Sequence, residues 1–181
     1  VPQNGGDSGR PAHSKSMLDK ARRTVRENVE TLAPRVREGW DVVSVEPSDS
    51  VMYQNDALDL LSGEDVERVA ANSYGVMEYI DAFDLDEGIQ FDSPGETLAY
   101  HGHCQQTAVK KDHHAVAVLE RAGYEVDDLD STCCGMAGSF GYEAEHYSMS
   151  KAIGRLLFDR VDDSPGEEVV APGTSCRSQL L

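Results

Sequence analysis

Four cysteines are the residues of this sequence best suited to chemistry. They are Cys104, the adjacent pair Cys133 and Cys134, and Cys176. The segment between Cys104 and the pair has 28 residues, and the segment between the pair and Cys176 has 41. Cysteine thiolates bind iron–sulfur clusters and tetrahedral zinc. Structural zinc sites often use cysteines separated by only about two to four residues, and we expect adjacent side chains to diverge toward different iron atoms. The spacing therefore favours an iron–sulfur cluster bound by all four cysteines.

The cysteine pair is followed by a run of small residues, namely Gly135, Ala137, Gly138, Ser139 and Gly141. Such residues let the backbone approach a cofactor closely. Backbone N–H groups that point at sulfur then donate hydrogen bonds that tune a metal centre. We expect this loop to surround the sulfur atoms.

Two other uses of the cysteines stay open at this point. A structural zinc ion would take one cysteine of the pair together with Cys104, Cys176 and a nearby histidine, His101 or His103. A thiol enzyme would use a cysteine of the pair as nucleophile with a histidine base. The sequence offers no recognisable oxyanion hole or acid partner, so we expect no catalytic residue. Disulfides are disfavoured by the length of the chain and by the strained ring that neighbouring cysteines would form.

Two histidines flank the first cysteine, in the segment His101-Gly102-His103-Cys104. Histidines at strand ends are often only hydrogen-bonded, but His103 is a candidate additional metal ligand. His113 and His114 lie on a polar helical stretch, where we expect exposed side chains.

The second half of the sequence alternates strands with helices. Strands are predicted at 97–100, 124–126 and 168–171, and helices at 107–121 and 143–161, with turns or loops at 131–141 and 172–176. This order indicates an α/β fold with parallel strands flanked by helices. Ligands gather where the carboxyl ends of parallel strands meet, so we expect the cysteine loops to converge there.

The first half looks like an incomplete copy of the second. It is predicted to begin with a loop at 1–13 and a helix at 14–37, which has an apolar face from Met17 to Leu32. A strand at 41–45 and a turn at 46–50 follow. Helices are then predicted at 51–61 and from 63 through Ile80, and a linker at 84–96. Ser16-Met17 through Lys20-Ala21 echoes Ser148-Met149 through Lys151-Ala152. This predicts tandem repeats with the first one truncated: the end of a first repeat at 1–62, a connector at 63–96 and a full repeat at 97–181.

The segment from Ser131 to Tyr142, with Cys133-Cys134-Gly135 at its centre, resembles the signature of the cysteine-rich (CCG) domain family. His101–Cys104 and Gly173–Arg177 are similar to the segments that carry the family's first and last cysteines. The family includes the B subunit of heterodisulfide reductase, the iron–sulfur subunits of anaerobic glycerol-3-phosphate dehydrogenase and glycolate oxidase, and FAD-linked D-lactate or D-2-hydroxyacid dehydrogenases with a fused iron–sulfur half.

This resemblance implies an electron-transfer module of an oxidoreductase that is not catalytic alone. It implies an iron–sulfur cluster of the 4Fe-4S type bound by Cys104, Cys133, Cys134 and Cys176. The implied partners are a domain or subunit that carries FAD, a ferredoxin-like iron–sulfur domain, and a quinone or another electron acceptor.

The sequence departs from the family pattern at two positions. Gly173 stands where the family often has the first cysteine of a Cys-x-x-Cys motif. Asp49 stands where many relatives place a cysteine of the first repeat. Asp49 is a candidate oxygen ligand, although formation of a turn is its expected role.

The chain carries a formal net charge of −17, with 33 acidic and 16 basic residues among 181. Acidic residues spread along the whole sequence, with little lysine, suggest a halophilic, haloarchaeal protein. Nucleic acid is not an expected partner, because phosphate binding needs basic patches. No stretch approaches the roughly 20 apolar residues of a spanning helix, and no signal peptide is recognised. We expect a cytoplasmic location, either free or bound through a partner to the inner face of the membrane. Because the sequence lacks an initiator methionine, we also expect that it was cut from a longer protein.

Overall fold

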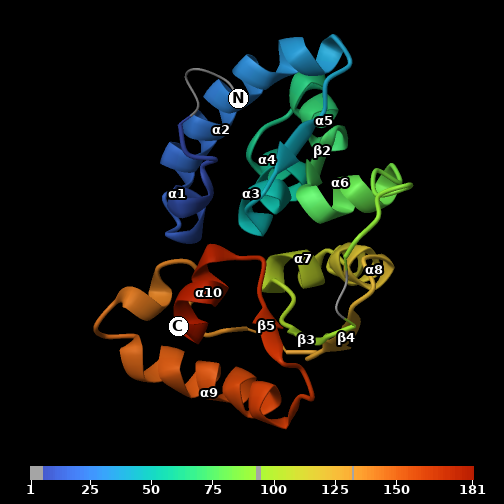
Figure 1. Cartoon of the computed structure of the whole chain (residues 1–181). Helices are drawn as coiled ribbons and strands as arrows, with labels where there is room; N and C mark the ends of the chain where they lie inside the picture. The colour runs from blue at the N-terminus through green and yellow to red at the C-terminus, as the bar shows by residue number, and fades with distance from the viewer. Residues whose placement is uncertain (1–5, 93–94, 132) are drawn as a thin grey trace. The chain divides into compact units, whose positions relative to one another are not determined.

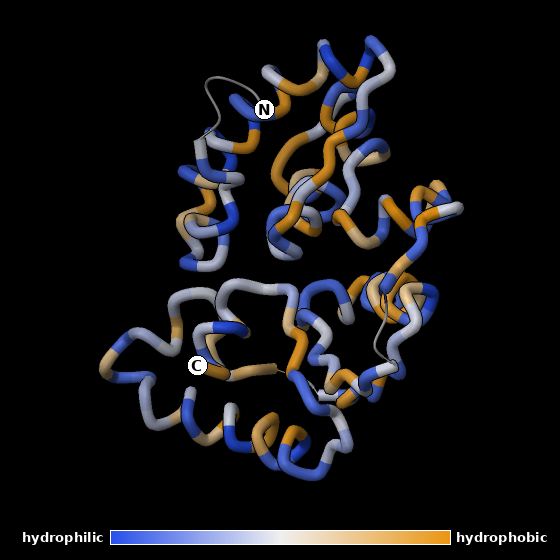
Figure 2. Tube along the Cα trace, viewed as in Figure 1, coloured by the Kyte–Doolittle hydropathy of each residue, from blue (hydrophilic) through white to orange (hydrophobic). Residues whose placement is uncertain are grey.

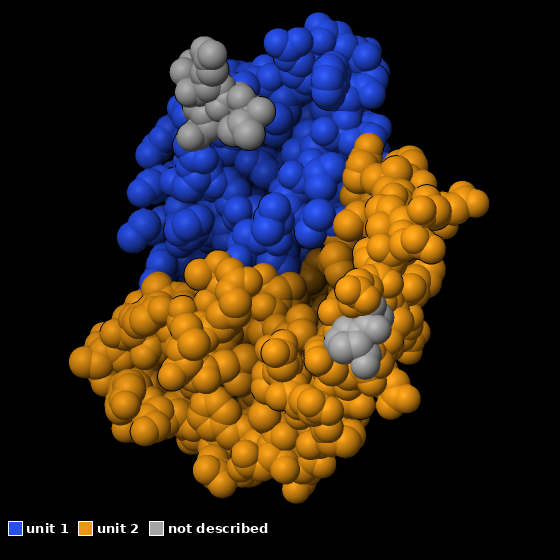
Figure 3. Space-filling view, viewed as in Figure 1, with its two compact units in different colours: residues 1–76 blue, residues 77–181 orange. Residues whose placement is uncertain are grey.

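The computed structural model describes residues 6–92, 95–131 and 133–181. Residues 1–5 of the predicted N-terminal loop, 93–94 of the predicted linker and Thr132 of the cysteine-pair segment lie outside the described residues. The chain divides into two compact units, residues 1–76 and 77–181 (Figure 3). The boundary lies inside the predicted connector at 63–96, and the proposed three-part repeat organisation stays a prediction.

Unit 1, residues 1–76, is mostly helical. Two short strands pair in parallel, from Val42 opposite Ser73 to Ser44 opposite Gly75. The elements in chain order are α1 (Arg10–Ser14), α2 (Leu18–Arg37), β1 (Val42–Ser44), α3 (Pro47–Val51), the π-helix η1 (Met52–Asp56), α4 (Ala57–Leu60), α5 (Glu64–Ala71) and β2 (Ser73–Gly75).

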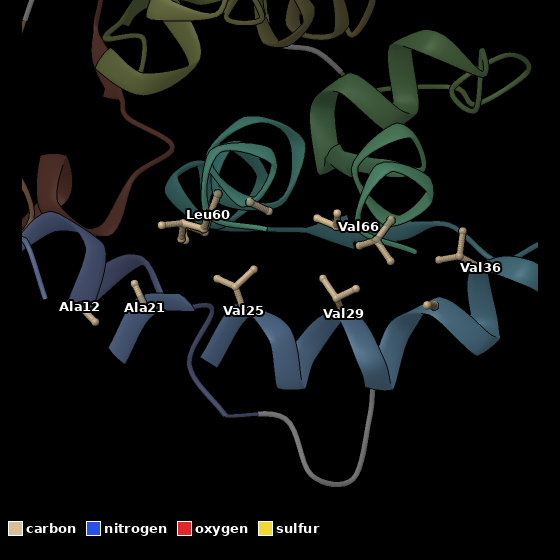
Figure 4. Close-up of a cluster of buried hydrophobic side chains, with 11 residues drawn as sticks. Ala12, Ala21, Val25, Val29, Val36, Leu60 and Val66 are labelled. Carbon is tan, nitrogen blue, oxygen red and sulfur yellow. The ribbon is translucent and has the colours of Figure 1, made fainter. Parts of the chain in front are cut away.

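The long helix α2 provides one wall of the unit 1 core. Apolar residues recur at intervals of about four along it, which places them on one face, and Ala21, Val25 and Val29 are buried as predicted. They pack with residues of α4 and α5, including Leu60 and Val66 (Figure 4). Met17 was predicted on the same face, but it precedes the helix and is exposed, so that part of the prediction is wrong.

Unit 2, residues 77–181, is built on a three-stranded parallel sheet with the order β4-β3-β5. Helix α9 lies on one side of the sheet, and α7 and α8 lie on the other (Figure 1). The predicted parallel α/β fold is therefore confirmed. After α6 (Val76–Ala82) at the unit boundary, the elements are β3 (Thr97–Tyr100), α7 (Cys104–Ala108), α8 (His113–Arg121), β4 (Glu125–Asp128), the 3-10 helix η2 (Phe140–Tyr142), α9 (Tyr147–Asp163), β5 (Glu168–Val170) and α10 (Thr174–Leu180).

Several predicted elements differ from the structure. The helix predicted from 63 through Ile80 is interrupted by β2, which pairs with β1. The turns predicted at 46–50 and 172–176 each lead into a helix, α3 and α10. The helix predicted at 107–121 is divided into α7 and α8 because Lys110, with φ 58°, adopts a left-handed conformation that cannot continue a right-handed helix.

Ion pairs attach α6 and the segment after it to α8 and to the loop before α8 within unit 2. Lys111 Nζ lies 2.6 Å from Glu78 Oε1, and Arg121 contacts both Asp81 and Asp86 at 2.7 Å. His114 Nδ1 lies 2.6 Å from Asp81 Oδ2. The prediction that His114 is exposed is therefore wrong. The hydrogen bond with His114, followed by the one from Arg121, lowers the pKa of Asp81.

Polar and apolar residues alternate along α9, as expected for a helix with one buried face (Figure 2). Leu157 is its most buried apolar residue and packs against Ala99 of the sheet. Among the residues that the structure describes, no helix combines the length and apolar character needed to cross a membrane.

Candidate metal centre

The four cysteines follow the carboxyl ends of the three parallel strands of unit 2. Cys104 begins α7 after β3, Cys133 and Cys134 lie in the loop after β4, and Cys176 lies in α10 after β5. Backbone hydrogen bonds hold the first residues beyond the strands side by side. The N–H of His101 donates to the carbonyl of Val170 at 2.9 Å. The fold therefore brings three loops to one edge of the sheet.

The four cysteines form a series of close neighbours, which we call the cysteine chain. All four are free thiols. The shifts of their pKa values pair Cys104 with Cys133, Cys133 with Cys134, and Cys134 with Cys176. The structure thus brings the four cysteines to one edge of the sheet. The expectation that the adjacent side chains diverge toward different iron atoms stays a prediction.

Two of the four cysteines are shielded from solvent, and backbone N–H groups donate to the adjacent pair. Cys134 and Cys176 are only 3% and 1% exposed. The N–H of Gly135 donates to Cys133 Sγ at 3.3 Å, and backbone N–H groups of Ala137 and Met136 also donate to the pair. The predicted role of the small-residue loop in donating N–H groups to sulfur is therefore confirmed.

The pKa values of the four cysteines shift in alternating directions along the cysteine chain. Interaction with Cys104 and Cys134 lowers the pKa of Cys133, and interaction with Cys134 lowers the pKa of Cys176. The same interactions raise the pKa of Cys104 and of Cys134, and burial raises both further. A metal ion bound to these sulfurs would displace the protons of the remaining thiols, which is the usual coupling between metal binding and thiol ionisation.

Glycine at position 135 lets the cysteine loop pack directly on α9. A Cβ atom added at Gly135 would overlap the carbonyl oxygen of Ser150 and lie 3.0 Å from the N atom of Gly154. A Cβ added at Gly154 would in turn lie 3.1 Å from the carbonyl oxygen of Cys134. Gly135 also has φ +92°, a conformation that residues with a side chain rarely adopt. The loop therefore depends on glycine for both space and backbone conformation.

His101 is the histidine that joins the cysteine chain. A ring nitrogen of His101, Cys134 Sγ and Cys176 Sγ all lie within 4.8 Å of one another, and all three residues are buried. Ser131 Oγ lies 2.5 Å from His101 Nδ1. His103 was the additional ligand expected from the sequence, in which nothing shows that Ser131 lies beside His101.

His103 has a different place in the structure. Its Nδ1 accepts a hydrogen bond from the N–H of Gln105 at 3.3 Å, which caps the start of α7. The ring packs on Gly173, where an added Cβ would overlap His103 and lie 3.4 Å from Cys176 Sγ. The absence of a side chain at Gly173 thus provides space for His103. A ligand role for His103 stays a prediction.

Asp49 belongs to unit 1 and lies in α3. Its Oδ1 accepts a hydrogen bond from Ser8 Oγ at 2.5 Å. The expected turn at this residue is replaced by a helix. A role for Asp49 as an oxygen ligand stays a prediction.

Comparisons with known proteins agree with this geometry. Residues 98–181 match the family model described as "Cysteine-rich domain". Over 176 residues the chain is 28% identical to D-2-hydroxyglutarate dehydrogenase from Escherichia coli, covering 96% of this chain and 17% of that protein. Over 181 residues it is 26% identical to the C subunit of anaerobic glycerol-3-phosphate dehydrogenase from Escherichia coli, covering 95% of this chain and 44% of that protein.

D-2-hydroxyglutarate dehydrogenase from Haemophilus influenzae is 24% identical over 181 residues, covering 96% of this chain and 18% of that protein. No solved structure gives a significant match. The chain thus spans less than half the length of these curated relatives. The match runs from Leu98 in β3 through α10 and includes all four cysteines, so the similarity to the cysteine-rich domain family lies in the part of unit 2 that carries the candidate metal centre.

Proposed function

We propose that unit 2 binds an iron–sulfur cluster and serves as an electron-transfer module of a flavin-linked dehydrogenase. The observation that carries this proposal is the cysteine chain at the sheet edge, in which four thiols are close neighbours. Thiolates are the protein ligands of iron–sulfur clusters. Burial and N–H donors to sulfur are the features by which proteins tune such clusters.

The residues of the site fit a cluster of this kind. Cys104, Cys133, Cys134 and Cys176 would hold it, and a 4Fe-4S type is our expectation from the resemblance. When bound, the cluster supplies one-electron chemistry. The chain's own contribution is to bury the sulfurs of Cys134 and Cys176 and to direct the N–H of Gly135 at Cys133 Sγ.

The electron donor would be a flavin carried on another domain or subunit. The relatives include a D-2-hydroxyglutarate dehydrogenase and one subunit of an anaerobic glycerol-3-phosphate dehydrogenase. We infer a 2-hydroxyacid or glycerol-3-phosphate type of parent enzyme, a ferredoxin-like iron–sulfur domain beside unit 2, and a quinone or similar carrier as acceptor. Any attachment to the inner membrane face would come through these partners.

The test is reconstitution of the full chain with iron and sulfide under anaerobic conditions. We expect several iron and sulfide ions per chain, visible absorption that bleaches on reduction, and reoxidation by a soluble quinone. Protein that stays colourless and takes up no iron would overturn the proposal. Reduction by a photoreduced flavin, compared with the unloaded chain, tests the direction of electron flow.

A zinc site is the second candidate, and one observation favours it. A nitrogen of His101 lies with Cys134 and Cys176 in a group small enough for a single ion, and tetrahedral zinc accepts mixed nitrogen and sulfur ligands. Elemental analysis after reconstitution separates the two candidates. Stoichiometric zinc that iron and sulfide do not displace would support a structural role in place of electron transfer.

A further inference from the structure

His101 is the most completely buried polar residue at the sheet edge, with 0% of its surface exposed. Its Nδ1 is engaged by Ser131 Oγ at 2.5 Å. Its Nε2 is buried and, among the residues that the structure describes, has no partner in hydrogen-bond geometry, although Cys176 Sγ lies near the ring. A buried polar atom without a partner costs about 1–3 kcal/mol, so a ligand bound to this nitrogen would offset that cost.

The missing partner lies in the direction of the cysteine chain. A ring nitrogen of His101 lies within 4.8 Å of both Cys134 Sγ and Cys176 Sγ. Separations of this size are those between ligand atoms that share a metal ion. Because Nδ1 faces Ser131, Nε2 is the nitrogen that is free to bind.

Ser131 completes an arrangement typical of metal-bound histidines. A histidine that binds a metal through one nitrogen usually donates its other N–H to an oxygen, which fixes the tautomer and the ring orientation. With a proton on Nδ1 donated to Ser131 Oγ, the lone pair of Nε2 is directed away from Ser131. His103 lacks this arrangement, because its Nδ1 accepts a hydrogen bond from the backbone of Gln105.

We propose that His101 is a nitrogen ligand of the metal centre, binding through Nε2 beside Cys134 and Cys176, with Ser131 as the residue that positions its ring. This inference rests on the proposed metal site and extends its ligand set beyond the cysteines. A neutral imidazole adds a ligand without adding negative charge. A cluster with imidazole at this position is therefore less negative and easier to reduce than one with a thiolate at the same position, as when histidine replaces cysteine at other iron–sulfur centres.

The test is pulsed electron paramagnetic resonance of the reconstituted chain, with histidine labelled with ¹⁵N. Cluster states that differ by one electron alternate between even and odd electron counts, so one of two neighbouring states is paramagnetic. We expect a strong ¹⁵N coupling typical of a directly bound nitrogen. A chain that shows only weak couplings, typical of a nitrogen outside the ligand set, would overturn the proposal.

Four variants assign the nitrogen and its role. His101→Cys is expected to keep the cluster, lose the ¹⁵N coupling and lower the reduction potential. His101→Gln can donate an N–H but is a poor ligand, and it is expected to lose the coupling and most of the iron. Ser131→Ala is expected to keep the coupling at a changed magnitude. His113→Gln, at an exposed histidine of α8, is the matched control and should resemble the wild type.

Two results would overturn the role of His101 as ligand. One is a ¹⁵N coupling that persists in His101→Cys or disappears in His113→Gln. The other is a His101→Gln chain with unchanged iron content and potential, which would make the ring a hydrogen-bond donor. If the chain takes up no iron, the proposed function fails, and the same ¹⁵N measurement on the chain loaded with Co²⁺ still decides whether His101 binds metal.

Discussion

Each unit contains a long helix, a strand and a short helix in the same order, but the residues at corresponding positions carry different chemical groups. Unit 1 contains the long helix α2, the strand β1 and the helix α3, and unit 2 contains α9, β5 and α10 in the same order. Asp49 is the third residue of α3, and Cys176 is the third residue of α10. Asp49 hydrogen-bonds with Ser8, whereas Cys176 is part of the cysteine chain.

The interiors differ in the same way. The unit 1 cluster consists of apolar side chains. The unit 2 cluster includes Cys134 and Cys176 beside Leu157 and Met136, with the imidazole of His101 buried next to it. The main hydrophobic cluster of unit 1 is hydrocarbon, whereas that of unit 2 includes thiols, which are groups able to bind a metal. We infer that elements in the same order can surround either an apolar cluster or the proposed metal site, depending on the side chains that follow the strands.

The largest expected effect comes from removing one buried thiol of unit 2. Cys134→Ser should abolish the visible absorption of the reconstituted chain while circular dichroism retains most of the helix signal. The hydroxyl is close in size to the thiol but is a poor ligand for iron, and α9 and the helices of unit 1 do not depend on it. Ser139→Ala, at an exposed residue of the same loop, is the control. Unchanged absorption and iron content in Cys134→Ser would remove this cysteine from the ligand set.

A smaller effect is expected where the cysteine loop packs on α9. Gly135→Ala would force an alanine into a left-handed conformation and into the carbonyl oxygen of Ser150, at a cost of about 3 kcal/mol. Gly138→Ala has the same conformational problem, φ +70°, but nothing lies within 4 Å of the added atom, so we expect about 1 kcal/mol.

Thermal unfolding and iron uptake of these two glycine variants, measured side by side, check this difference. The packing of the loop on α9 predicts that only Gly135→Ala loses most of its iron. Equal losses in both variants would show that backbone conformation, and not contact with α9, determines the position of the loop.

A substitution in the core of unit 1 should lower the stability of that unit without reducing the iron content of unit 2. Val25 is fully buried, and Val25→Ala should destabilise unit 1 by about 2 kcal/mol through the lost apolar contacts. Iron uptake by unit 2 should be unchanged. Hydrogen exchange followed by mass spectrometry resolves the two units, and Val45→Ala, at a valine that is 78% exposed, is the control. A parallel loss of iron in Val25→Ala would contradict the independence of the two cores.

The sequence predicted the parts of this fold that depend on regular patterns. Strands at 97–100 and 168–170 were recognised from their composition, and the convergence of the cysteine loops follows from the parallel order of the strands. The strand β2 was missed because Ser73-Tyr74-Gly75 has no strand pattern and depends on pairing with β1. Helix α10 was missed because Pro172-Gly173 is typical of a turn.

The histidine of the site could not be identified from the sequence. His101 and His103 lie on either side of Gly102, so their positions in the sequence do not show which of them is the better candidate for a metal ligand. The choice between them depends on Ser131, which is 30 residues from His101 in sequence and hydrogen-bonds with its Nδ1. It also depends on the backbone of Gln105, which engages His103.

The smallest expected effect tests whether Asp49 behaves as the counterpart of Cys176. If its role is confined to unit 1, Asp49→Asn should weaken the hydrogen bond from Ser8 and cost about 1 kcal/mol, with no change in iron content. Burial, followed by the negative charge of Asp49, raises the pKa of Tyr53 to about 12. Removing that charge makes the tyrosinate easier to form, so the pKa of Tyr53 should fall.

Ultraviolet titration of Asp49→Asn against the wild type checks the shift of Tyr53, and Asp59→Asn, at an exposed residue of α4, is the control. An unchanged iron content with a lowered tyrosine pKa would place Asp49 in the local structure of unit 1. A loss of iron in Asp49→Asn, absent in Asp59→Asn, would instead make Asp49 an oxygen ligand. The same helical position would then serve a metal centre in both units, and the contrast between the two units would no longer hold at this residue.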